Sequence, residues 1–377
     1  MSDTVPSPAP ASSAPPLWRD AHAWVLLALA ILLAGGFFSM TWQTGDDARY
    51  MGLAQSLLDG KGFTKAYLPD GEPETITPPA QPLLMAAAMK VFGRGVVPGK
   101  VTSSALFVLG TLAIYAWARR RLGDPWLAAG VTVMGQFTMA VLSMSCWYMV
   151  EMNYMAASFI VLALAGRDDV ERRPGLVLAI GMLAGYVYLV RATGLAFAAA
   201  GGLFFLGRRS WRSLALFVAG FLLLAGPWMV RTYLVTGATE AYLPLQTSMA
   251  GADQAASYPW QRIPRDIAKA FPVYYAQALP DALFYRLTGE FGLMRKVGLS
   301  ALEPAVRWLV LGLVTGGFLL RLRRPRLADL YWVFYWLIIT APPFPPQGHW
   351  YVYPMLPLAA AYLMDAVLGL GGLLGRV

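Results

Sequence analysis

The sequence predicts an all-α membrane protein with many spanning helices. Hydrophobic residues make up 57% of its 377 residues and charged residues only 14%, whereas about a quarter of the residues in a soluble domain are charged. Long apolar segments recur along the chain, and the arginines gather in short clusters between them. Much of the chain is therefore expected to lie in lipid.

The apolar segments are the expected spanning helices, because about 20 mostly apolar residues cross a bilayer. Roughly ten segments qualify on this criterion. Their residues are 24–40, 101–118, 126–144, 150–165, 176–190, 194–206, 214–230, 305–320, 330–340 and 352–370. The first is a spanning helix or an uncleaved signal anchor, since no small-residue cleavage site follows it. Segments 194–206 and 330–340 are short and need flanking residues to cross.

The first residues of the chain are low in complexity. Residues 1–16 are rich in Pro, Ala and Ser, which is typical of a disordered segment. We therefore expect a disordered cytoplasmic tail over residues 1–20 and a single transmembrane domain over residues 21–377.

Four arginine clusters predict the orientation. Ten spans place all of them on one side of the membrane, together with Arg19 and Arg376, and the positive-inside rule makes that side cytoplasmic. This also explains the formal charge of +9 without a nucleic-acid partner. The clusters are Arg119 to Arg121; Arg167, Arg172 and Arg173; Arg208, Arg209 and Arg212; and Arg321, Arg323, Arg324 and Arg326.

The opposite, outer side receives two long loops, residues 42–99 and 231–304. Loops of this length usually carry function. Prolines divide the second loop into short pieces, at Pro244, Pro259, Pro264, Pro272 and Pro280. The candidate site is therefore expected on the outer side.

The first loop opens with two adjacent carboxylates, Asp46 and Asp47. From Asp46 onward apolar residues recur with helical spacing, and we expect a helix that ends near Gly60 or Gly62. Asp46, Arg49 and Tyr50 fall on its apolar stripe, with Asp47 at the edge and Ala48, Gly52, Gln55 and Asp59 on the opposite face. The alternative is an N-cap with an interfacial anchor. An acid, a base and a tyrosine on the apolar side favour function, because such groups at a membrane face are costly.

Glu151 is the second unusual charge, at the outer end of a span with Asn153 and Tyr154 beside it. It is either a snorkelling residue near the interface or part of a catalytic cavity. Sequence alone leaves both interpretations open.

Arg191 and Arg231 lie at outer helix ends, where the positive-inside rule does not call for arginine. Snorkelling explains one of them, but the two together indicate an anionic ligand such as a phosphate. His349 lies in the proline- and aromatic-rich stretch 342–357, where it either binds and titrates or is a hydrogen-bonded bystander.

The sequence limits metal chemistry. Cys146 is the only cysteine, and His22 and His349 are the only histidines. A thiolate cluster and an imidazole-based centre are both excluded. A divalent cation would have to bind carboxylates and carbonyls.

The ordered motifs of the chain resemble the GT-C glycosyltransferases that use polyprenyl-phosphate sugars, the group of protein O-mannosyltransferases and aminoarabinose transferases. "DDARY" at 46–50 is similar to the family's D-E-x-R-Y, and "TPPAQPLL" at 77–84 to its P-P-x-x-P-L-L. "LVRATGL", "GPWMVRTYLVTG" and "HWYVYPMLPLAAAYL" resemble R-P-T-G-L, P-W-x-x-R-N-Y and R-Y-x-x-P-x-x-P-L. Asp47, Thr232 and His349-Trp350 depart from the family pattern.

The resemblance implies a GT-C-like bundle with amphipathic helices in the first outer loop and an enzyme of the bacterial inner membrane. It implies an inverting transfer of sugar from a polyprenyl-phosphate carrier to an acceptor hydroxyl. Asp46 would be the base, while Arg49 and Arg231 would hold the lipid phosphate. The wider expected sets are Asp46, Asp47 and Glu151 for catalysis, and Arg49, Tyr50, Arg191, Arg231, Tyr233, His349 and Tyr351 for donor binding.

The chemistry agrees with one catalytic carboxylate. A phosphate is a good leaving group, so a single base and nearby cations suffice, whereas a glycosidase needs two facing carboxylates. Asp46 and Asp47 diverge on the helix. No cofactor is required, and a divalent cation, the sugar and the acceptor stay open. The alternatives are a transporter or flippase of lipid-linked sugars, which more often shows repeats and broken helices, and a structural scaffold.

Overall fold

The computed structural model describes residues 16–39, 45–66, 68–237, 263–284, 293–341 and 349–374. Within these ranges the chain is helical, and its one extended pairing is an isolated antiparallel bridge between Thr64 and Pro73. The predicted all-α class is therefore confirmed.

The described helices follow one another along the chain, and residues 59–79 form the connection between α2 and α3. A π-helix, Pro272–Ala278, joins α13 to α14. The helices are α1 (Ala21–Phe37), α2 (Gly45–Leu58), α3 (Ala80–Phe92), α4 (Val96–Leu122), α5 (Pro125–Gln136), α6 (Met139–Met144), α7 (Glu151–Ala165), α8 (Pro174–Val190), α9 (Leu195–Gly207), α10 (Trp211–Thr236), α13 (Ile263–Phe271), α14 (Leu279–Leu283), α15 (Leu293–Lys296), α16 (Glu303–Arg321), α17 (Leu327–Thr340) and α18 (Leu356–Leu374).

In its described residues, each apolar segment that the sequence marks as a span forms helix over most of its length. Segment 126–144 is divided into α5 and α6, because the side chain of Thr138 accepts a hydrogen bond from the backbone N–H of Val141 and starts a new helix. Among the described residues, four helices are long and apolar enough to cross a membrane, namely α4, α10, and α16 and α18, each with the turn before it. The protein is a multi-pass membrane protein.

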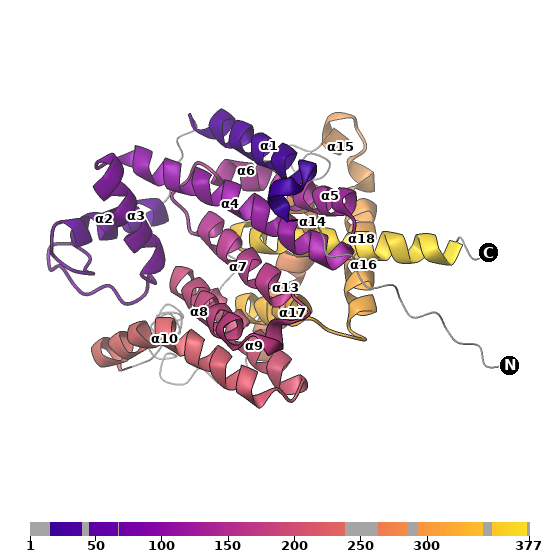
Figure 1. The fold of residues 1–377 in the computed structure, drawn as a ribbon. Helices are drawn as coiled ribbons and strands as arrows, with labels where there is room; N and C mark the ends of the chain where they lie inside the picture. The colour runs from indigo at the N-terminus through magenta and orange to yellow at the C-terminus, as the bar shows by residue number, and fades with distance from the viewer. Residues whose placement is uncertain are drawn as a thin grey trace.

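The core of the bundle is formed by α4 with α7 and by α8 with α10, while α16 packs across α18 and α17 packs on α9 (Figure 1). The contact between α8 and α10 depends on small residues. A Cβ at Gly181 would lie 2.2 Å from the carbonyl oxygen of Phe217, and one at Gly220 would lie 2.3 Å from that of Leu178. Such close backbone approach is typical of helix packing in membranes.

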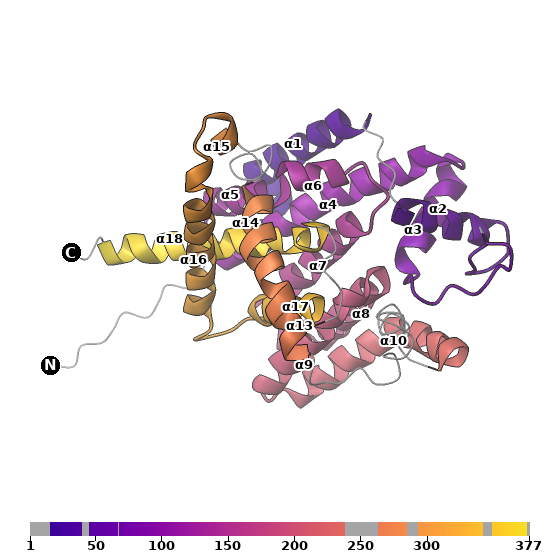
Figure 2. The same cartoon turned by 180° about the vertical axis from the view of Figure 1, so that it is seen from behind.

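Helices α2 and α3 pack on each other and project from one end of the bundle, at the left of Figure 1. The amphipathic helices expected in the first outer loop are thereby confirmed. Part of the second loop is also helical, since α13, the π-helix and α14 form a diagonal rod over α16 and α17 in Figure 2. Pro244 and Pro259 lie outside the described residues.

The four arginine clusters meet at the end of the bundle away from α2 and α3. Arg121 at the end of α4 forms an ion pair with Asp329 of α17, and Arg208 forms one with Glu171 before α8. The predicted gathering of the clusters at one end is therefore confirmed, although Arg376 is outside the described residues. Residues 1–15 of the expected tail are outside them too, while Leu17–Arg19 form a 3-10 turn and Asp20 caps α1.

Candidate active site

Glu151 and Arg191 form a buried ion pair where α7 begins and α8 ends. Glu151 Oε1 accepts a hydrogen bond from Arg191 Nη1 at 2.9 Å, and the Glu151 side chain is 0% exposed. The guanidinium of Arg191 lies 3.9 Å from the centroid of the Tyr351 ring, in the 3-10 helix His349–Tyr351. Complete burial excludes the snorkelling interpretation of Glu151.

The local sequence explains this placement. Glu151 is the first residue of α7, where a carboxylate is favoured by the helix dipole. Arg191 leaves α8 in an extended conformation, and the chain turns at once through Ala192–Gly194. A Cβ at Gly194 would lie 2.5 Å from the backbone nitrogen of Tyr188, so this tight return needs glycine. The side chain of Arg191 is thereby held over Glu151.

Tyr50 joins the first loop to this ion pair. Burial is the main cause that raises the pKa of Tyr50 above its ordinary value, and the charges of Glu151 and Asp46 raise it further. The charges of Arg191 and Arg49 oppose this increase. Four charged residues expected from the sequence therefore lie within electrostatic range of Tyr50, namely Glu151, Asp46, Arg191 and Arg49.

The two aspartates of α2 have different environments from those expected. Asp46 and Arg49 are exposed, whereas Asp47 is only 1% exposed. The expectation that Asp46 lies with the apolar stripe and Asp47 at its edge is wrong. The reason is that α2 packs through Ala54 onto Met85 and Met89 of α3, which centres the buried face on the side of Asp47.

Tyr148 lies beside this buried aspartate. Burial raises the pKa of Tyr148 to about 12, and the charge of Asp47 contributes. Burial also raises the pKa of Cys146, on which Lys100 and Asp47 act in opposite directions. Asp47 therefore belongs to the contact between the first loop and the bundle, behind the surface on which Asp46 is exposed.

Arg231 fastens the first loop to α10. Its guanidinium donates hydrogen bonds to the carbonyl oxygens of Glu74 at 2.7 Å and Phe63 at 3.2 Å. It also lies 5.1 Å from the centroid of the Trp228 ring. Arg231 thus holds the ends of the segment that the bridge between Thr64 and Pro73 closes.

Two residues of the expected donor-binding set are not placed with the others. Tyr233 follows Arg231 by two residues, about 200° around the helix, and is 54% exposed. The side chain of His349 lies outside what the structure describes. Its role stays a prediction.

Lys100 is a buried cation that the sequence analysis missed. It is 7% exposed, and its Nζ donates to the carbonyl oxygen of Phe38 at 2.8 Å, which ties the start of α4 to the end of α1. The available signal was a lysine at the outer end of an apolar segment, where the positive-inside rule does not call for one.

A chain of buried polar groups holds α3 against the bundle. Asn153 of α7 donates to Gln81 of α3 at 3.0 Å and accepts from the hydroxyl of Tyr186 of α8 at 3.0 Å. Gln81 in turn donates to the carbonyl oxygen of Tyr148. Buried hydrogen bonds of this kind fix relative positions, because a broken one leaves unpaired polar groups. They set the distance between the first loop and Glu151.

Metal-binding groups of three or more His, Cys, Asp or Glu side chains are absent from the part of the chain that the structure describes. The site is instead made of single carboxylates, guanidinium groups and tyrosines. Such a set can accept a proton and bind an anion.

No protein-family model matches the sequence, and no curated protein sequence matches it. The structure, however, is similar to solved structures. ArnT from Cupriavidus metallidurans bound to undecaprenyl phosphate has a TM-score of 0.61 at 18% identity, and its apo state has a TM-score of 0.60 at 18% identity. Each comparison covers 92% of this chain and 60% of the ArnT chain.

The oligosaccharyltransferase of Archaeoglobus fulgidus, solved in complex with Zn and sulfate, has a TM-score of 0.54 at 14% identity. That comparison covers 93% of this chain and 49% of the oligosaccharyltransferase chain. The chain thus spans about half to three fifths of the length of these proteins. The predicted fold is confirmed: this chain has the GT-C fold, the helical membrane fold that both kinds of transferase share.

Proposed function

We propose that this protein is an inverting glycosyltransferase that moves a sugar from a polyprenyl-phosphate carrier to an acceptor hydroxyl. The observation that carries the proposal is that the exposed Asp46 and Arg49 and the buried ion pair of Glu151 and Arg191 all lie within electrostatic range of Tyr50. Its fold supports this reading, since ArnT with the same fold was crystallised with undecaprenyl phosphate.

Asp46 is the proposed base. Its carboxylate is exposed at the first turn of α2, so an incoming hydroxyl can reach it without displacing packed side chains. Asp47 is buried and is not proposed as the base. In one displacement the hydroxyl oxygen attacks the anomeric carbon, its proton passes to Asp46, and the bond to the carrier phosphate breaks. Attack from the face opposite the phosphate inverts the anomeric configuration.

Arg49 is the proposed ligand of the departing phosphate. It lies one turn beyond Asp46 on the same exposed surface of α2. A guanidinium stabilises the negative charge that grows on the leaving oxygen, so no general acid is needed. Arg231 is occupied by two backbone carbonyls, and we assign it to shaping the loop.

The Glu151–Arg191 pair and Tyr50 complete the arrangement. The pair is a fixed dipole behind α2, and Glu151 Oε2 makes no hydrogen bond to any described residue. Tyr50 is protonated at neutral pH, as a tyrosine ordinarily is, so its hydroxyl is a neutral donor, and the raised pKa of Tyr50 extends this to alkaline pH. We place this site on the outer face of a bacterial inner membrane. The opposite end of the bundle, where the four arginine clusters meet (the arginine end), is expected on the cytoplasmic side.

The test is transfer by the purified full chain in nanodiscs. Undecaprenyl-phosphate hexose labelled in the sugar is supplied with an envelope extract as the source of acceptors. Wild-type protein should release undecaprenyl phosphate, and Asp46→Asn should lower the rate by about 100-fold or more. Asp59→Asn is the matched control, since Asp59 is exposed at the far end of α2 and pairs with Arg94 at 2.7 Å.

Two outcomes would contradict the proposal. A folded Asp46→Asn protein with the wild-type rate would remove Asp46 as base. Movement of the intact lipid-linked sugar across vesicles, without release of undecaprenyl phosphate, would identify a flippase instead. The anomeric configuration of the product, measured by NMR, tests inversion.

A further inference from the structure

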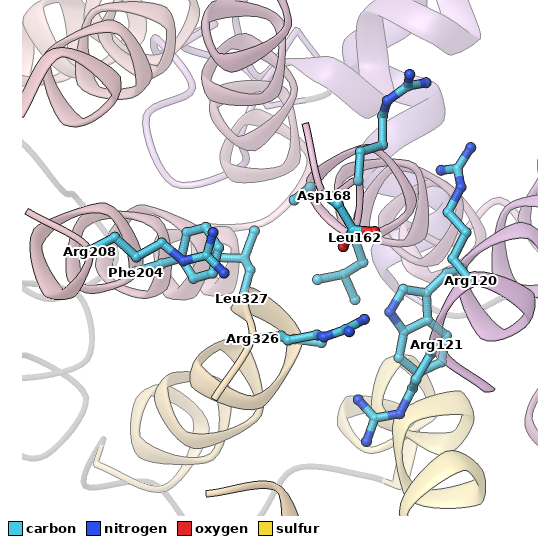
Figure 3. A pocket seen from close by; sticks show the side chains of 13 residues that line it. Arg120, Arg121, Leu162, Asp168, Phe204, Arg208, Arg326 and Leu327 are labelled. Atoms are coloured by element: carbon cyan, nitrogen blue, oxygen red, sulfur yellow. The ribbon is translucent and has the colours of Figure 1, made fainter. Parts of the chain in front are cut away.

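A cavity of about 160 Å³ lies at the arginine end of the bundle. Five arginines and one acid line it, contributed by all four arginine clusters: Arg120, Arg121, Arg167, Arg208, Arg326 and Asp168. Figure 3 shows Arg326 extending from the start of α17 into the space between Arg208 on one side and Arg120 and Arg121 on the other.

This cavity is separate from the candidate active site. Ala165, which ends α7, lines the cavity, whereas Glu151 begins the same helix at the other end. A rise of about 1.5 Å per residue separates them by about 21 Å. The proposed transfer reaction therefore does not use these arginines.

The arginines of the cavity are only partly neutralised. Arg167 pairs with Asp169 at 3.1 Å, and Arg208 pairs with Glu171 at 2.8 Å. Arg121 pairs with Asp329 and Asp365, of which Asp365 also binds Arg321.

Arg120 and Arg326 differ from these three. Arg120 donates to the carbonyl oxygen of Ala163. Over the ranges that the structure covers, no carboxylate lies within ion-pair distance of Arg120 or Arg326. The cavity therefore keeps an excess of positive charge.

The positive-inside rule explains why arginines are present at this end, but it requires no convergence. Arg120, Arg208 and Arg326 are exposed, as Arg323 and Arg324 are, but Arg323 and Arg324 do not line the cavity. Here the guanidinium groups share a cavity with apolar walls, formed by Trp117, Leu162, Phe204 and Leu327. A low-dielectric wall strengthens the attraction between these cations and an anion.

We propose that this cavity binds a phosphate group. Guanidinium forks match phosphate oxygens in paired hydrogen bonds, and five guanidinium groups line this cavity. A volume of about 160 Å³ accommodates a phosphate and its water, but it does not accommodate a polyprenyl chain. The ligand is the phosphate of an anionic lipid head group or a free phosphate.

Arginine footprinting of the wild-type chain is the first test. The full chain is treated with phenylglyoxal in three settings: phosphatidylcholine nanodiscs, the same nanodiscs with inorganic phosphate, and nanodiscs that contain phosphatidylglycerol. Mass spectrometry then gives the modification of each arginine. We expect Arg120 and Arg326 to be protected relative to Arg323 when the ligand is present. Protection only by phosphatidylglycerol identifies a lipid head group, and protection by inorganic phosphate identifies a free phosphate.

Matched double variants are the second test. Arg120→Gln/Arg326→Gln removes two charges that line the cavity, and Arg323→Gln/Arg324→Gln removes two charges from the same end that do not line it. Each lost charge-assisted hydrogen bond should lower the affinity for the effective ligand about tenfold. We expect the cavity variant to bind about 100-fold more weakly and the control to bind as wild type.

Two results would overturn the proposal. One is equal protection of Arg323 and Arg326 in every setting, which needs no variant and indicates general electrostatic attraction. The other is equal weakening of binding by the two double variants. Neither readout depends on sugar transfer, so the failure of one proposal leaves the other standing.

Discussion

Arg191 Nη1 lies 2.9 Å from Glu151 Oε1, and the carboxylate that it meets is completely buried. This contact joins the end of α8 to the start of α7 under the first outer loop. A buried ion pair adds little net stability, because desolvation offsets the attraction, but removal of one partner leaves an uncompensated charge. The free energy of coupling between Glu151 and Arg191 can therefore be measured by substitution of one or both residues.

Arg191→Met is expected to lower the free energy of unfolding by about 3–5 kcal/mol, since Glu151 would remain buried without its cation. The double variant Glu151→Met/Arg191→Met should be more stable than Arg191→Met alone, because no charge is left behind. Denaturant unfolding in detergent, arranged as a double-mutant cycle, gives the coupling free energy. Additive losses would show that the two side chains do not interact.

Tyr50 predicts a dependence of stability on alkaline pH. Its pKa is raised above the ordinary value of 10.0. Above that pH the unfolded state releases this proton while the folded state keeps it, so stability falls as pH rises from 10.0 toward the higher folded-state value. Tyr50→Phe should lose less stability over this range, by at most about 1.4 kcal/mol per pH unit. Parallel pH curves for both proteins would contradict the assignment.

Loss of the Arg231 side chain is expected to loosen the first loop locally and not the whole bundle. Arg231→Gln removes the hydrogen bonds to the carbonyl oxygens of Phe63 and Glu74 and leaves buried groups with weaker partners, at about 1–3 kcal/mol. Hydrogen exchange should accelerate in residues 61–77 and not in α7. Arg94→Gln is the control, because its pair with Asp59 is exposed and contributes little. Unchanged exchange in residues 61–77 would show that Arg231 does not hold the loop.

Two glycines of α10 give a packing test on one helix. Gly220→Ala places a Cβ 2.3 Å from the carbonyl oxygen of Leu178 and must separate α8 from α10. A loss of about 1–3 kcal/mol is expected from such overpacking. Gly226→Ala meets nothing within 4 Å and should be neutral or stabilising, since alanine favours helix. Thermal unfolding midpoints in the same detergent compare the two, and equal effects would contradict the close helix contact.

The sequence identified candidate charged residues along the chain, but it did not show which face of α2 would be buried. It identified Asp46, Arg49, Glu151 and Arg191 as unusual charges on one side; in the structure Arg191 pairs with Glu151, and all four charges act on Tyr50. It misjudged Asp47, because the side of α2 that is buried depends on where α3 packs.

Contacts between distant segments escaped the sequence for the same reason. Arg231 binds the carbonyl oxygens of Phe63 and Glu74, more than 150 residues earlier in the chain. The burial of Lys100 depends on the backbone of Phe38 at the end of another helix. Backbone acceptors carry no sequence signature, so helical periodicity cannot reveal such partners.

By itself the amino-acid order determined that the protein is a helical membrane bundle, where its helices lie, and that its arginines gather at one end. These properties are local, because a helix of apolar residues satisfies its own backbone hydrogen bonds in lipid. Only the tertiary structure decided which carboxylate is exposed, which arginine is an ion-pair partner and which one holds a loop. Those outcomes depend on the packing of neighbouring helices, which removes some charged groups from solvent and leaves others open.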